Sequence, residues 1–600
     1  MGRDDIVNVR SVVEGTVVAI PRDVGSEVAA ATPIVMVELM KLEQPIVAPD
    51  AGLVVEVLVE VGDTVEIDQV VARIDLEGVA DASAEPSDDA GTREDLLQLR
   101  ERLHLTTDAA RPEAVERRRA TGSRTARENL AELVDEGSFV EYGALAHAAQ
   151  RLRRSAEELR TRTPADGIIT GVGTVDGIRV AVAIYDETVL AGTQGHTGHA
   201  KLDRILQVAH DQHLPFVLYA EGGGGRPGDT DVLGGAWLGV PSFRLLAQLS
   251  GKVPVLAVVH GRTFAGNAVL AGCADVIVAT EQAVLGMAGP AMVAGGGLGE
   301  VDADELGPVW QHRATGAVDV VVRDEESATS TVRRLLGLLT GTRSDDVEAA
   351  DQEALRTVIP QDAKRTHDAD RLLDLFVDRG SAVELRRDAA RGMRTVLARL
   401  GGRPVGILAN DPVHLAGAID GDGAESAARF LQLCDVHGLP VISLVDTPGF
   451  MVGPESDADA AVRRTARLFL AGANLRVPMV AVVVRRAFGL GAMAMVGGDL
   501  QAPAATFAWP SATLGPMGLE GAVRLGARRE LDELSPAERE ERVAALTAAA
   551  REHASALNIA TFAEIDAVID PAETREHVLR LLSSLDGRPP GAPRAHAPAW

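Results

Sequence analysis

The stretch VPVLAVVHGRTFAGN (residues 253–267) decides the fold of most of this chain, because it returns as VPMVAVVVRRAFGLG at residues 477–491. Each copy opens with a continuous apolar run and ends in small residues. Apolar runs that alternate with helical segments are typical of buried, largely parallel strands. The repetition therefore predicts an α/β fold of two homologous domains that pack together.

Segments on either side of this stretch are duplicated too. LAELVDEGS (residues 130–138) corresponds to LDLFVDRGS (residues 373–381). LQVAHDQHLP (residues 206–215) corresponds to LQLCDVHGLP (residues 431–440), and each of these two leads into an apolar strand that ends in glycine. The duplication therefore covers the whole body of the chain and not one motif alone.

Both copies of the stretch end in a strand-to-helix turn of small residues. Such a turn leaves backbone N–H groups uncovered at a helix N-terminus, where they can hold a negatively charged oxygen. One N–H group aimed at a developing oxyanion in a dry site is worth roughly 3–4 kcal/mol. Close packing of helix on strand would also explain a single turn of this kind. Two turns in register favour the oxyanion interpretation.

A second duplication, of a different kind, occupies the N-terminus. VVEGTVVAI (residues 12–20) returns thirty-seven positions later as PDAGLVVEV (residues 49–57). A duplicated set of short alternating strands predicts a small, all-β flattened barrel with pseudo-twofold symmetry. Lys41 lies between the copies, at the expected tight turn. The chain has four lysines and takes nearly all its other positive charge from arginine, which argues against a solubilising role for this one.

The composition excludes several classes of partner. The net charge is −28 and no block of the chain is strongly basic, which argues against binding to a nucleic-acid backbone. Aromatic residues make up 3% of the chain, too few for a base-stacking surface. The N-terminus has no apolar signal region, and the longest apolar run, residues 477–484, is too short to span a bilayer. We expect a cytoplasmic protein with no nucleic acid and no membrane among its partners.

Cysteine usage agrees with that compartment. Cys273 and Cys434 are the only cysteines, and both lie in apolar, helix-like runs. They are typical of core thiols in a reducing environment rather than of a disulfide or a metal pair. We expect no metal site.

The composition changes sharply behind the N-terminal duplication. Residues 77–93 are rich in Ala, Asp, Ser, Gly and Pro, and predict a flexible linker behind a carrier domain at residues 1–76. A tether of this length spans about 20–25 Å on average, which suits a swinging carrier. An inert spacer would have the same composition. The body is expected to divide into domains at residues 94–345 and 346–586, with a disordered tail at residues 587–600.

Residues 5–76 resemble the biotinyl domain of biotin-dependent carboxylases. That family attaches biotin to the lysine of a Met-Lys-Met turn, which Met40-Lys41 matches, and Leu42 keeps the apolar flank in place of the second Met. Lipoyl domains share the fold but usually carry an acidic-Lys-Ala turn, which does not match. The resemblance implies biotin bound covalently to Lys41. An unmodified lysine in an ordinary β-turn is the alternative.

The body resembles the carboxyltransferase component of acyl-CoA carboxylases over nearly all of residues 94–580. The matching motifs are TARE (125–128), DEGSF (135–139), RPVG (403–406), VDTPGF (445–450), AWP (508–510) and MGLEGAV (517–523). The resemblance implies two crotonase-like domains, with acyl-CoA bound mainly by the first, carboxybiotin bound by the second, and usually a hexamer. It also implies transfer of CO₂ to the α-carbon of the acyl group without a side-chain nucleophile.

The resemblance assigns the chemistry to backbone donors. The N–H groups of Gly266 and Asn267 would hold the thioester enolate oxygen, and those of Gly491 and Ala492 the ureido oxygen of biotin. Asn267 and Leu490 depart from the glycine-rich turns of the family and reduce backbone freedom.

Substrate contacts are expected near the same turns. The candidates are Gly222, Gly223, Gly224, Phe488 and Ala494, with Lys201 and Arg226 as possible contacts of the CoA phosphates. Solvated surface charge explains the two cations equally well. Met493 and Ala494 are smaller and more apolar than the residues common in the family at this point, which hints at a longer acyl chain.

The chain offers no ATP-grasp biotin carboxylase domain. The resemblance therefore implies a separate biotin carboxylase subunit and a biotin protein ligase as partners, with a homo-hexamer as the assembly. Two alternatives stay open beside an acyl-CoA carboxylase subunit. One is a transcarboxylase or biotin-dependent decarboxylase that runs the transfer in reverse. The other is a carrier and scaffold whose transferase site has decayed at Asn267 and Leu490.

Overall fold

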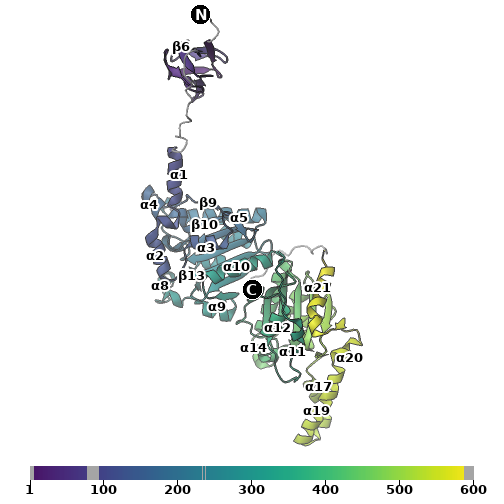
Figure 1. Ribbon diagram of the computed structural model, residues 1–600. Helices are drawn as coiled ribbons and strands as arrows, with labels where there is room; N and C mark the ends of the chain where they lie inside the picture. The colour runs from purple at the N-terminus through teal and green to yellow at the C-terminus, as the bar shows by residue number, and fades with distance from the viewer. Residues whose placement is uncertain (1–5, 77–92, 233, 235, 237, 587–600) are drawn as a thin grey trace. The chain divides into compact units, whose positions relative to one another are not determined.

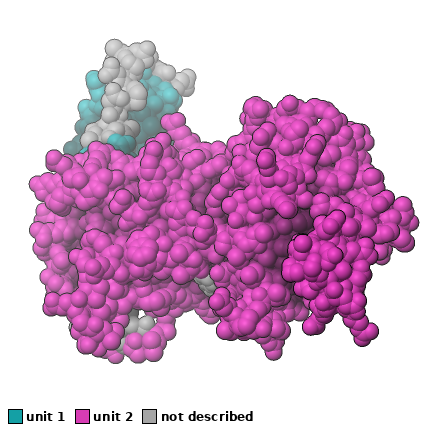
Figure 2. Space-filling model, turned by 90° about the horizontal axis from the view of Figure 1, so that it is seen from below, with its two compact units in different colours: residues 1–101 teal, residues 102–600 magenta. Residues whose placement is uncertain are grey.

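The computed structural model describes residues 6–76, 93–232, 234, 236 and 238–586 (Figure 1). The chain divides into two compact units, residues 1–101 and residues 102–600 (Figure 2). Residues 77–92 of the predicted linker and the whole predicted tail lie outside the described residues.

The first unit is the predicted flattened barrel. Its strands are β1 (Ile6–Arg10), β2 (Gly15–Ala19), β3 (Glu27–Val28), β4 (Pro33–Leu39), β5 (Leu42–Val47), β6 (Gly52–Val57), β7 (Thr64–Val65) and β8 (Val70–Asp75). They form two antiparallel sheets with the orders β1-β8-β6-β3 and β5-β4-β2-β7. Adding four to each strand number, and continuing from β8 to β1, converts the first order into the second. The predicted pseudo-twofold symmetry is therefore confirmed.

Two glycines of the barrel hold equivalent places because no side chain fits there. A Cβ at Gly15 would lie 2.4 Å from the carbonyl oxygen of Glu38, and a Cβ at Gly52 would lie 2.6 Å from that of Asp75. Both distances are far below van der Waals contact. Close approach of the strands therefore explains why glycine recurs at these positions in the two copies.

The second unit contains two copies of one α/β architecture. The strands of the first copy are β9 (Val140–Tyr142), β10 (Ile168–Val175), β11 (Ile178–Tyr185), β12 (Phe216–Gly222), β13 (Val255–Phe264), β14 (Val276–Thr280), β15 (Val284–Gly286) and β16 (Val320–Val322). Those of the second copy are β17 (Val383–Leu385), β18 (Met393–Leu400), β19 (Arg403–Asn410), β20 (Val441–Thr447), β21 (Met479–Phe488), β22 (Ala505–Ala508), β23 (Thr513–Gly515) and β24 (Ala567–Val568).

The two sheets have the same topology. Their orders are β9-β10-β11-β12-β13-β14-β16 and β17-β18-β19-β20-β21-β22-β24, with β15 beside β13 and β23 beside β21. The first two pairings of each sheet are antiparallel and the rest are parallel. The prediction of duplicated, largely parallel sheets is confirmed.

Helices cover both sheets (Figure 1). In the first copy they are α2 (Pro112–Ala120), α3 (Ala126–Leu133), α4 (Ala156–Arg162), α5 (His196–Gln212), α6 (Ser242–Ala247), α7 (Gly266–Gly272), α8 (Pro290–Gly295), α9 (Val309–Thr315) and α10 (Glu325–Leu339). Helix α1 (Glu94–His104) comes before them in the chain and has no buried residue. In the second copy they are α11 (Leu355–Val358), α12 (Ala369–Phe376), α13 (Gly421–Val436), α14 (Pro454–Ala458), α15 (Ala461–Ala473), α16 (Gly489–Met495), α17 (Leu519–Gly526), α18 (Arg528–Asp532), α19 (Pro536–His553), α20 (Ala556–Ala560) and α21 (Thr574–Ser584).

One apolar core joins the two copies. Helix α10 contributes Val332 and Leu336, and strands β18 and β19 contribute Leu397 and Leu408, all of them fully buried. The copies therefore form a single body, within which the predicted division near residue 345 stays a prediction. Among the described residues, no helix combines the length and apolarity that crossing a bilayer requires.

The TARE motif is a helix cap and not a catalytic group. The Thr125 hydroxyl accepts a hydrogen bond from the N–H of Glu128, and the Glu128 carboxylate accepts one from the N–H of Thr125. This reciprocal capping box satisfies two donors at the start of α3 that the helix itself leaves unpaired.

Candidate functional site

The carrier turn joins β4 to β5. Leu39 pairs with Leu42 across the hairpin, so Met40 and Lys41 form a loop of two residues. Both have positive φ, 54° for Met40 and 67° for Lys41, as a type I′ turn requires. Lys41 is exposed and Met40 is 91% exposed. An accessible primary amine on a tight turn suits an amide bond to the carboxyl group of biotin, so these residues fit the expected prosthetic group.

A strained loop lies beside each strand-to-helix turn of the body. The φ values of residues 190–192 are 51°, 54° and 60°, and those of residues 415–417 are 46°, 51° and 80°. Both loops read Leu-Ala-Gly. Left-handed backbone at two successive non-glycine residues is costly and is found mainly at functional sites. Its recurrence in both copies marks the two loops as parts of the candidate site.

The first turn follows β13 at Ala265 and opens helix α7. Ala265 has φ 49° and ψ −120°, a strained conformation for a residue with a Cβ. Gly266 comes next, and a Cβ there would lie 2.1 Å from Oε1 of Gln194. A Cβ at Gly224 would lie 2.7 Å from that of Ala265, so the predicted glycine loop after β12 reaches the same turn.

Asn267 joins three segments of this turn through its side chain. Nδ2 donates to the carbonyl oxygen of Gly192 at 3.0 Å and to that of Glu221 at 2.7 Å. Gly222 is close to the same amide, since a Cβ there would lie 2.8 Å from Nδ2. Asn267 is fully buried. The residue that departs from the family pattern therefore fixes the strained loop and the glycine loop against helix α7.

The second turn follows β21 and opens helix α16. Gly489 has φ 59°, which places left-handed backbone where the first copy has Ala265. Gly491 packs on the loop after β20, because a Cβ there would lie 2.6 Å from the carbonyl carbon of Gly449 and 2.8 Å from the nitrogen of Phe450. Backbone thus contacts backbone at Gly491, where the first copy has the amide of Asn267.

The sheet registers show which residues of the two turns are equivalent. Gly222 pairs with Thr263 in the first copy, and Thr447 pairs with Ala487 in the second. Counting on from these pairs, the equivalents of Gly266 and Asn267 are Leu490 and Gly491. The predicted pairs Gly266–Asn267 and Gly491–Ala492 are therefore one residue out of register.

This register changes the expected role of Ala492. Helix α16 has Phe488 as its N-cap, which makes Ala492 the fourth helical residue. An N–H in that position ordinarily bonds to the N-cap carbonyl, whereas the N–H of Gly491 belongs to the unpaired first turn. Gly491 is therefore the stronger candidate donor in the second copy.

A cavity of about 1250 Å³ opens beside the second turn. Phe488, Pro448, Arg485 and Arg486 line it at the carboxyl ends of β20 and β21. Motif residues that the sequence singled out also line it, namely Trp509, Pro510, Gly518, Leu519, Glu520 and Gly521. Ligands of α/β sheets bind at the carboxyl ends of parallel strands. The cavity is therefore the candidate ligand pocket of the second copy.

Three predicted contacts lie elsewhere. Lys201 is 7% exposed, and its ammonium donates to the carbonyl oxygens of Ala165 and Ile168. Burial lowers the pKa of Lys201 to about 8, with Glu141 and Asp166 acting in the opposite direction. Lys201 therefore stabilises the backbone near Ala165 and Ile168 and does not make the predicted phosphate contact.

Arg226 and Ala494 differ from prediction in the same way. The Arg226 guanidinium is buried, and donates to the carboxylate of Asp166 at 2.5 Å and to the carbonyl oxygen of Thr193 at 2.7 Å. Ala494 is fully buried in the core, while its neighbour Met493 is 39% exposed. Met493 therefore reaches the surface at this point, whereas Ala494 does not.

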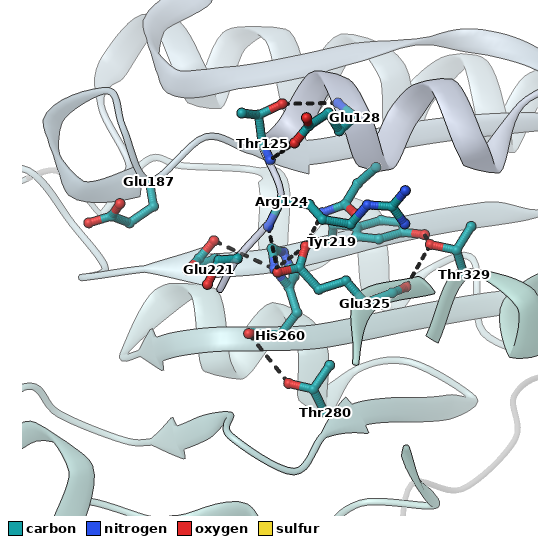
Figure 3. Close-up of polar contacts among 12 residues, drawn as sticks. Arg124, Thr125, Glu128, Glu187, Tyr219, Glu221, His260, Thr280, Glu325 and Thr329 are labelled. Carbon is teal, nitrogen blue, oxygen red and sulfur yellow. Dashed lines mark hydrogen bonds and ion pairs between the residues drawn. The ribbon is translucent and has the colours of Figure 1, made fainter. Parts of the chain in front are cut away.

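A buried cluster of charged side chains contains Glu221, His260 and Glu325 (Figure 3). Arg118 donates to both carboxylate oxygens of Glu221, at 2.7 and 2.8 Å, and Glu221 directly precedes the glycine loop. Glu221 also limits the strand beside it, because a Cβ at Gly261 would lie 1.9 Å from Oε1. Sequence reasoning did not predict this cluster.

His260 and Glu325 complete the cluster. His260 Nδ1 lies 3.4 Å from Glu325 Oε2 and 3.7 Å from Glu221 Oε2. Burial alone lowers the pKa of His260, but the two carboxylates outweigh it and raise the pKa above 6.5. Burial raises the pKa of Glu325, but His260, Asn129 and the Arg124 N–H outweigh it and lower the pKa to about 2. The two carboxylates therefore favour the protonated imidazole, against the burial of the ring and the charge of Arg118.

This charge state predicts a pH-dependent stability. A histidine with a raised folded pKa stabilises the fold fully below 6.5, and the contribution is lost as the pH rises through the folded pKa. A tenfold difference in proton affinity between the folded and unfolded states is worth about 1.4 kcal/mol. The urea midpoint of the wild type should therefore exceed that of His260→Gln most at pH 5.5 to 6. The difference between the two urea midpoints should become smaller above neutral pH. A difference that stays constant from pH 5.5 to 9 would contradict a raised pKa for His260.

The second copy holds a corresponding cluster. Asp446, fully buried, accepts from Arg485 Nη2 at 2.7 Å and from Arg486 Nε at 2.6 Å. Burial raises the pKa of Asp446, but the two arginines outweigh it and lower the pKa. Asp446 lies just before the loop after β20, as Glu221 lies just before the glycine loop after β12. Each copy therefore has a buried, arginine-paired carboxylate at the equivalent position.

Comparison with known proteins agrees with this geometry. Residues 117–591 match the model of the carboxyl transferase domain, and residues 9–74 match that of the biotin-requiring enzymes. The propionyl-CoA carboxylase beta chain of Saccharopolyspora erythraea is 33% identical over 527 residues, which cover 84% of this chain and 95% of that one.

Two solved structures share the fold. A single-chain, multi-domain long-chain acyl-CoA carboxylase has a TM-score of 0.80 and 47% identity, over 97% of this chain and 56% of that one. This chain thus spans little more than half the length of that enzyme. The hexameric transcarboxylase 12S, with methylmalonyl-CoA bound, has a TM-score of 0.72 and 30% identity, over 84% of this chain and 98% of that one.

The family match covers most of the chain, and the carrier turn and the duplicated crotonase-like sheets agree with it. The chain therefore belongs to the carboxyl transferase family, as a biotin-dependent acyl-CoA carboxyltransferase that carries its own biotinyl domain.

Proposed function

We propose that this protein transfers CO₂ from biotin on Lys41 to the α-carbon of a long-chain acyl-CoA. The observation that carries the proposal is the register of the two turns, which puts Asn267 and Gly491 at equivalent places in the two copies. Biotin, when attached, supplies the ureido group that carries CO₂. The chain supplies the donors that hold negative oxygens on either side of the transfer.

The first turn would act on the acyl thioester. The N–H groups of Gly266 and Asn267 belong to the first turn of α7 and have no acceptor within the helix. Their hydrogen bonds strengthen as the thioester oxygen gains charge, which stabilises the enolate more than the ground state. The Asn267 side chain and the Glu221–Arg118 pair hold this turn in place before substrate binds.

The second turn would act on the ureido oxygen. The N–H of Gly491 belongs to the first turn of α16, and Phe488, the N-cap of that helix, lines the cavity. A charged ureido oxygen accepts a stronger hydrogen bond than a neutral one. The N–H of Gly491 would therefore favour release of CO₂ from biotin in a site that excludes water.

A long acyl chain is favoured by the exposed face of α16. Leu490 is 62% exposed and Met493 is 39% exposed, and three residues apart they share one face of the helix. Exposed apolar side chains beside a site commonly mark the surface that a ligand covers. The similarity to the long-chain acyl-CoA carboxylase supports the same choice.

Acyl selectivity supplies a prediction. With a panel of acyl-CoAs, kcat/KM for a sixteen-carbon chain should exceed that for acetyl-CoA at least tenfold. The variant Met493→Asp should reduce this preference, because it places a charge where the acyl chain would lie. Val462→Asp changes an equally apolar residue that is 77% exposed on another helix, and should leave the preference unchanged. Equal rates across the panel would contradict the long-chain assignment.

The partners are proposed from the names of the relatives. Because the propionyl-CoA carboxylase relative is named as a beta chain, we propose a separate biotin carboxylase subunit, and a biotin protein ligase that modifies Lys41. The protein with ATP, bicarbonate and acyl-CoA should fix no bicarbonate until a biotin carboxylase is added. Fixation without one would contradict this proposal.

The assembly is proposed from the same relatives. Because transcarboxylase 12S is described as a hexamer, we propose a hexamer here as well. Light scattering should then give six times the 62.9 kDa of one chain. The transcarboxylase relationship also keeps transfer in the reverse direction as a second candidate function.

A further inference from the structure

A second cavity lies at the junction between the two copies of the body, and we call it the junction cavity. Its volume is about 630 Å³. It is lined by the end of α9, the loop after β17, and residues of α13 and α15. No residue of either oxyanion turn lines it. The junction cavity is therefore distinct from the proposed transfer site.

A buried arginine with poor hydrogen bonding lines the junction cavity. Arg386 is 6% exposed, and its guanidinium makes one long hydrogen bond, from Nη2 to the carbonyl oxygen of Ser426 at 3.4 Å. Nε has no hydrogen-bond acceptor among the described residues. The nearest carboxylate oxygen to Nε, Oδ1 of Asp319, is 3.6 Å away. Buried N–H donors ordinarily have a hydrogen-bond acceptor, so the missing acceptor of Arg386 Nε requires an explanation.

The charge of Arg386 is poorly compensated. Arg429 also lines the cavity, and its Nη2 lies 3.7 Å from the same Oδ1 of Asp319. One carboxylate therefore faces two guanidinium groups, and its other oxygen accepts the N–H of Ile277 at 2.8 Å. Burial, with Arg429, lowers the pKa of Arg386 to about 10, which leaves it charged at neutral pH. A buried guanidinium is costly when its only paired carboxylate lies beyond hydrogen-bond distance and also faces a second arginine.

A hydroxyl and a balanced rim complete the lining. Ser426 Oγ, on α13, is buried and has no hydrogen-bond partner among the described residues. At the rim, Arg464 and Arg467 are paired with Glu425 at 2.9 and 2.7 Å, and Arg464 also contacts Asp422. The rim arginines are thus paired with carboxylates, and the guanidinium that lacks a carboxylate within hydrogen-bond distance lies deeper, at Arg386.

We propose that the junction cavity binds a phosphate group, held by Arg386, Arg429 and the hydroxyl of Ser426. A phosphate oxygen would supply the acceptor that Arg386 Nε lacks and the partner that Ser426 Oγ lacks. Its charge would also complement that of Arg386, and guanidinium–phosphate pairs are among the stronger hydrogen-bonded contacts in proteins. The volume exceeds that of inorganic phosphate, so the group belongs either to free phosphate or to a small phosphate ester.

Titration calorimetry on the full-length, biotinylated chain tests this proposal. Inorganic phosphate is titrated at constant ionic strength set with chloride, and one phosphate should bind per chain. Arg386→Lys keeps the charge but removes Nε, and should weaken binding at least tenfold. Ser426→Ala should weaken it about threefold. Arg463→Gln removes an exposed arginine of α15 outside the cavity and should leave binding within a factor of two.

The outcomes separate clearly. AMP that binds tighter than phosphate and competes with it identifies a phosphate ester as the ligand, whereas phosphate binding without AMP binding identifies free phosphate. Absence of saturable binding overturns the proposal, as does binding that Arg386→Lys and Ser426→Ala leave unchanged. If Arg386→Lys does not fold, Ser426→Ala decides, because it removes only a hydroxyl group.

Discussion

The Lys41→Arg variant is expected to contain no biotin and to lose transfer from protein-bound biotin at least a thousandfold. Arginine keeps the charge and suits the exposed turn, but its guanidinium does not form the amide that anchors biotin. Intact mass and avidin binding report the modification. CO₂ release with free biotin as acceptor should stay within twofold of the wild type, because residues 1–101 form a unit apart from the transferase body.

The control for this variant is Lys252→Arg. Lys252 is exposed and lies in the body, so its replacement should leave both biotin content and transfer unchanged. Biotin found on the Lys41→Arg protein would contradict the attachment site. A loss of the free-biotin reaction in that variant would show that the carrier contributes to the transferase site itself.

Gly491→Ala is expected to lower kcat by a factor of one hundred to one thousand. The added Cβ would lie 2.6 to 2.8 Å from backbone atoms of Gly449 and Phe450, so the start of α16 must shift. Such a shift moves the N–H of Gly491 away from the ureido oxygen, and loss of one donor of this kind costs about 3–4 kcal/mol. Steady-state kinetics with free biotin and an α-carboxyacyl-CoA measure the effect.

Gly526→Ala is the matched control for Gly491→Ala. Gly526 ends helix α17 in the same copy, and a Cβ there meets no atom within 4 Å. The kcat of Gly526→Ala should equal that of the wild type. Turnover of Gly491→Ala within threefold of the wild type would remove Gly491 from the site, and the same loss in Gly526→Ala would point to general destabilisation.

The internal duplications allowed the fold to be predicted from the sequence. Repeated apolar runs at residues 253–259 and 477–483 predicted paired sheets, and the structure gives both sheets one strand order. The repeat at residues 12–20 and 49–57 predicted the barrel and put Lys41 at its turn. Repeats are informative because each copy tests the interpretation of the other.

Details that depend on one residue of register were harder to predict. Motif comparison paired Gly266–Asn267 with Gly491–Ala492, whereas the sheet pairing aligns Asn267 with Gly491. Leu490 obscured this, because it has a glycine on either side and either one could be matched with Gly266. The backbone pairing of Thr263 and Ala487 with the neighbouring strands confirms the residue-for-residue alignment of residues 253–267 with residues 477–491.

The buried charge clusters were missed for a different reason. Glu221 and Asp446 each stand near the end of an apolar strand, and the sequence alone does not show that Arg118 or Arg486 reaches them. Their equivalent positions in the two copies were the available signal. Lys201 shows the opposite error, in which a charge predicted to contact phosphate is buried. Nothing in the sequence of its helix predicts that its ammonium donates to two backbone carbonyl oxygens.

The most direct test of the account is the reverse half-reaction on the biotinylated protein. CO₂ release is measured from malonyl-CoA and from longer α-carboxyacyl-CoAs, with free biotin as the acceptor. The account predicts release that depends on biotin and is fastest with the long acyl chains. Absence of release from every substrate, with intact mass confirming biotin on Lys41, would contradict a working transferase and favour a carrier and scaffold.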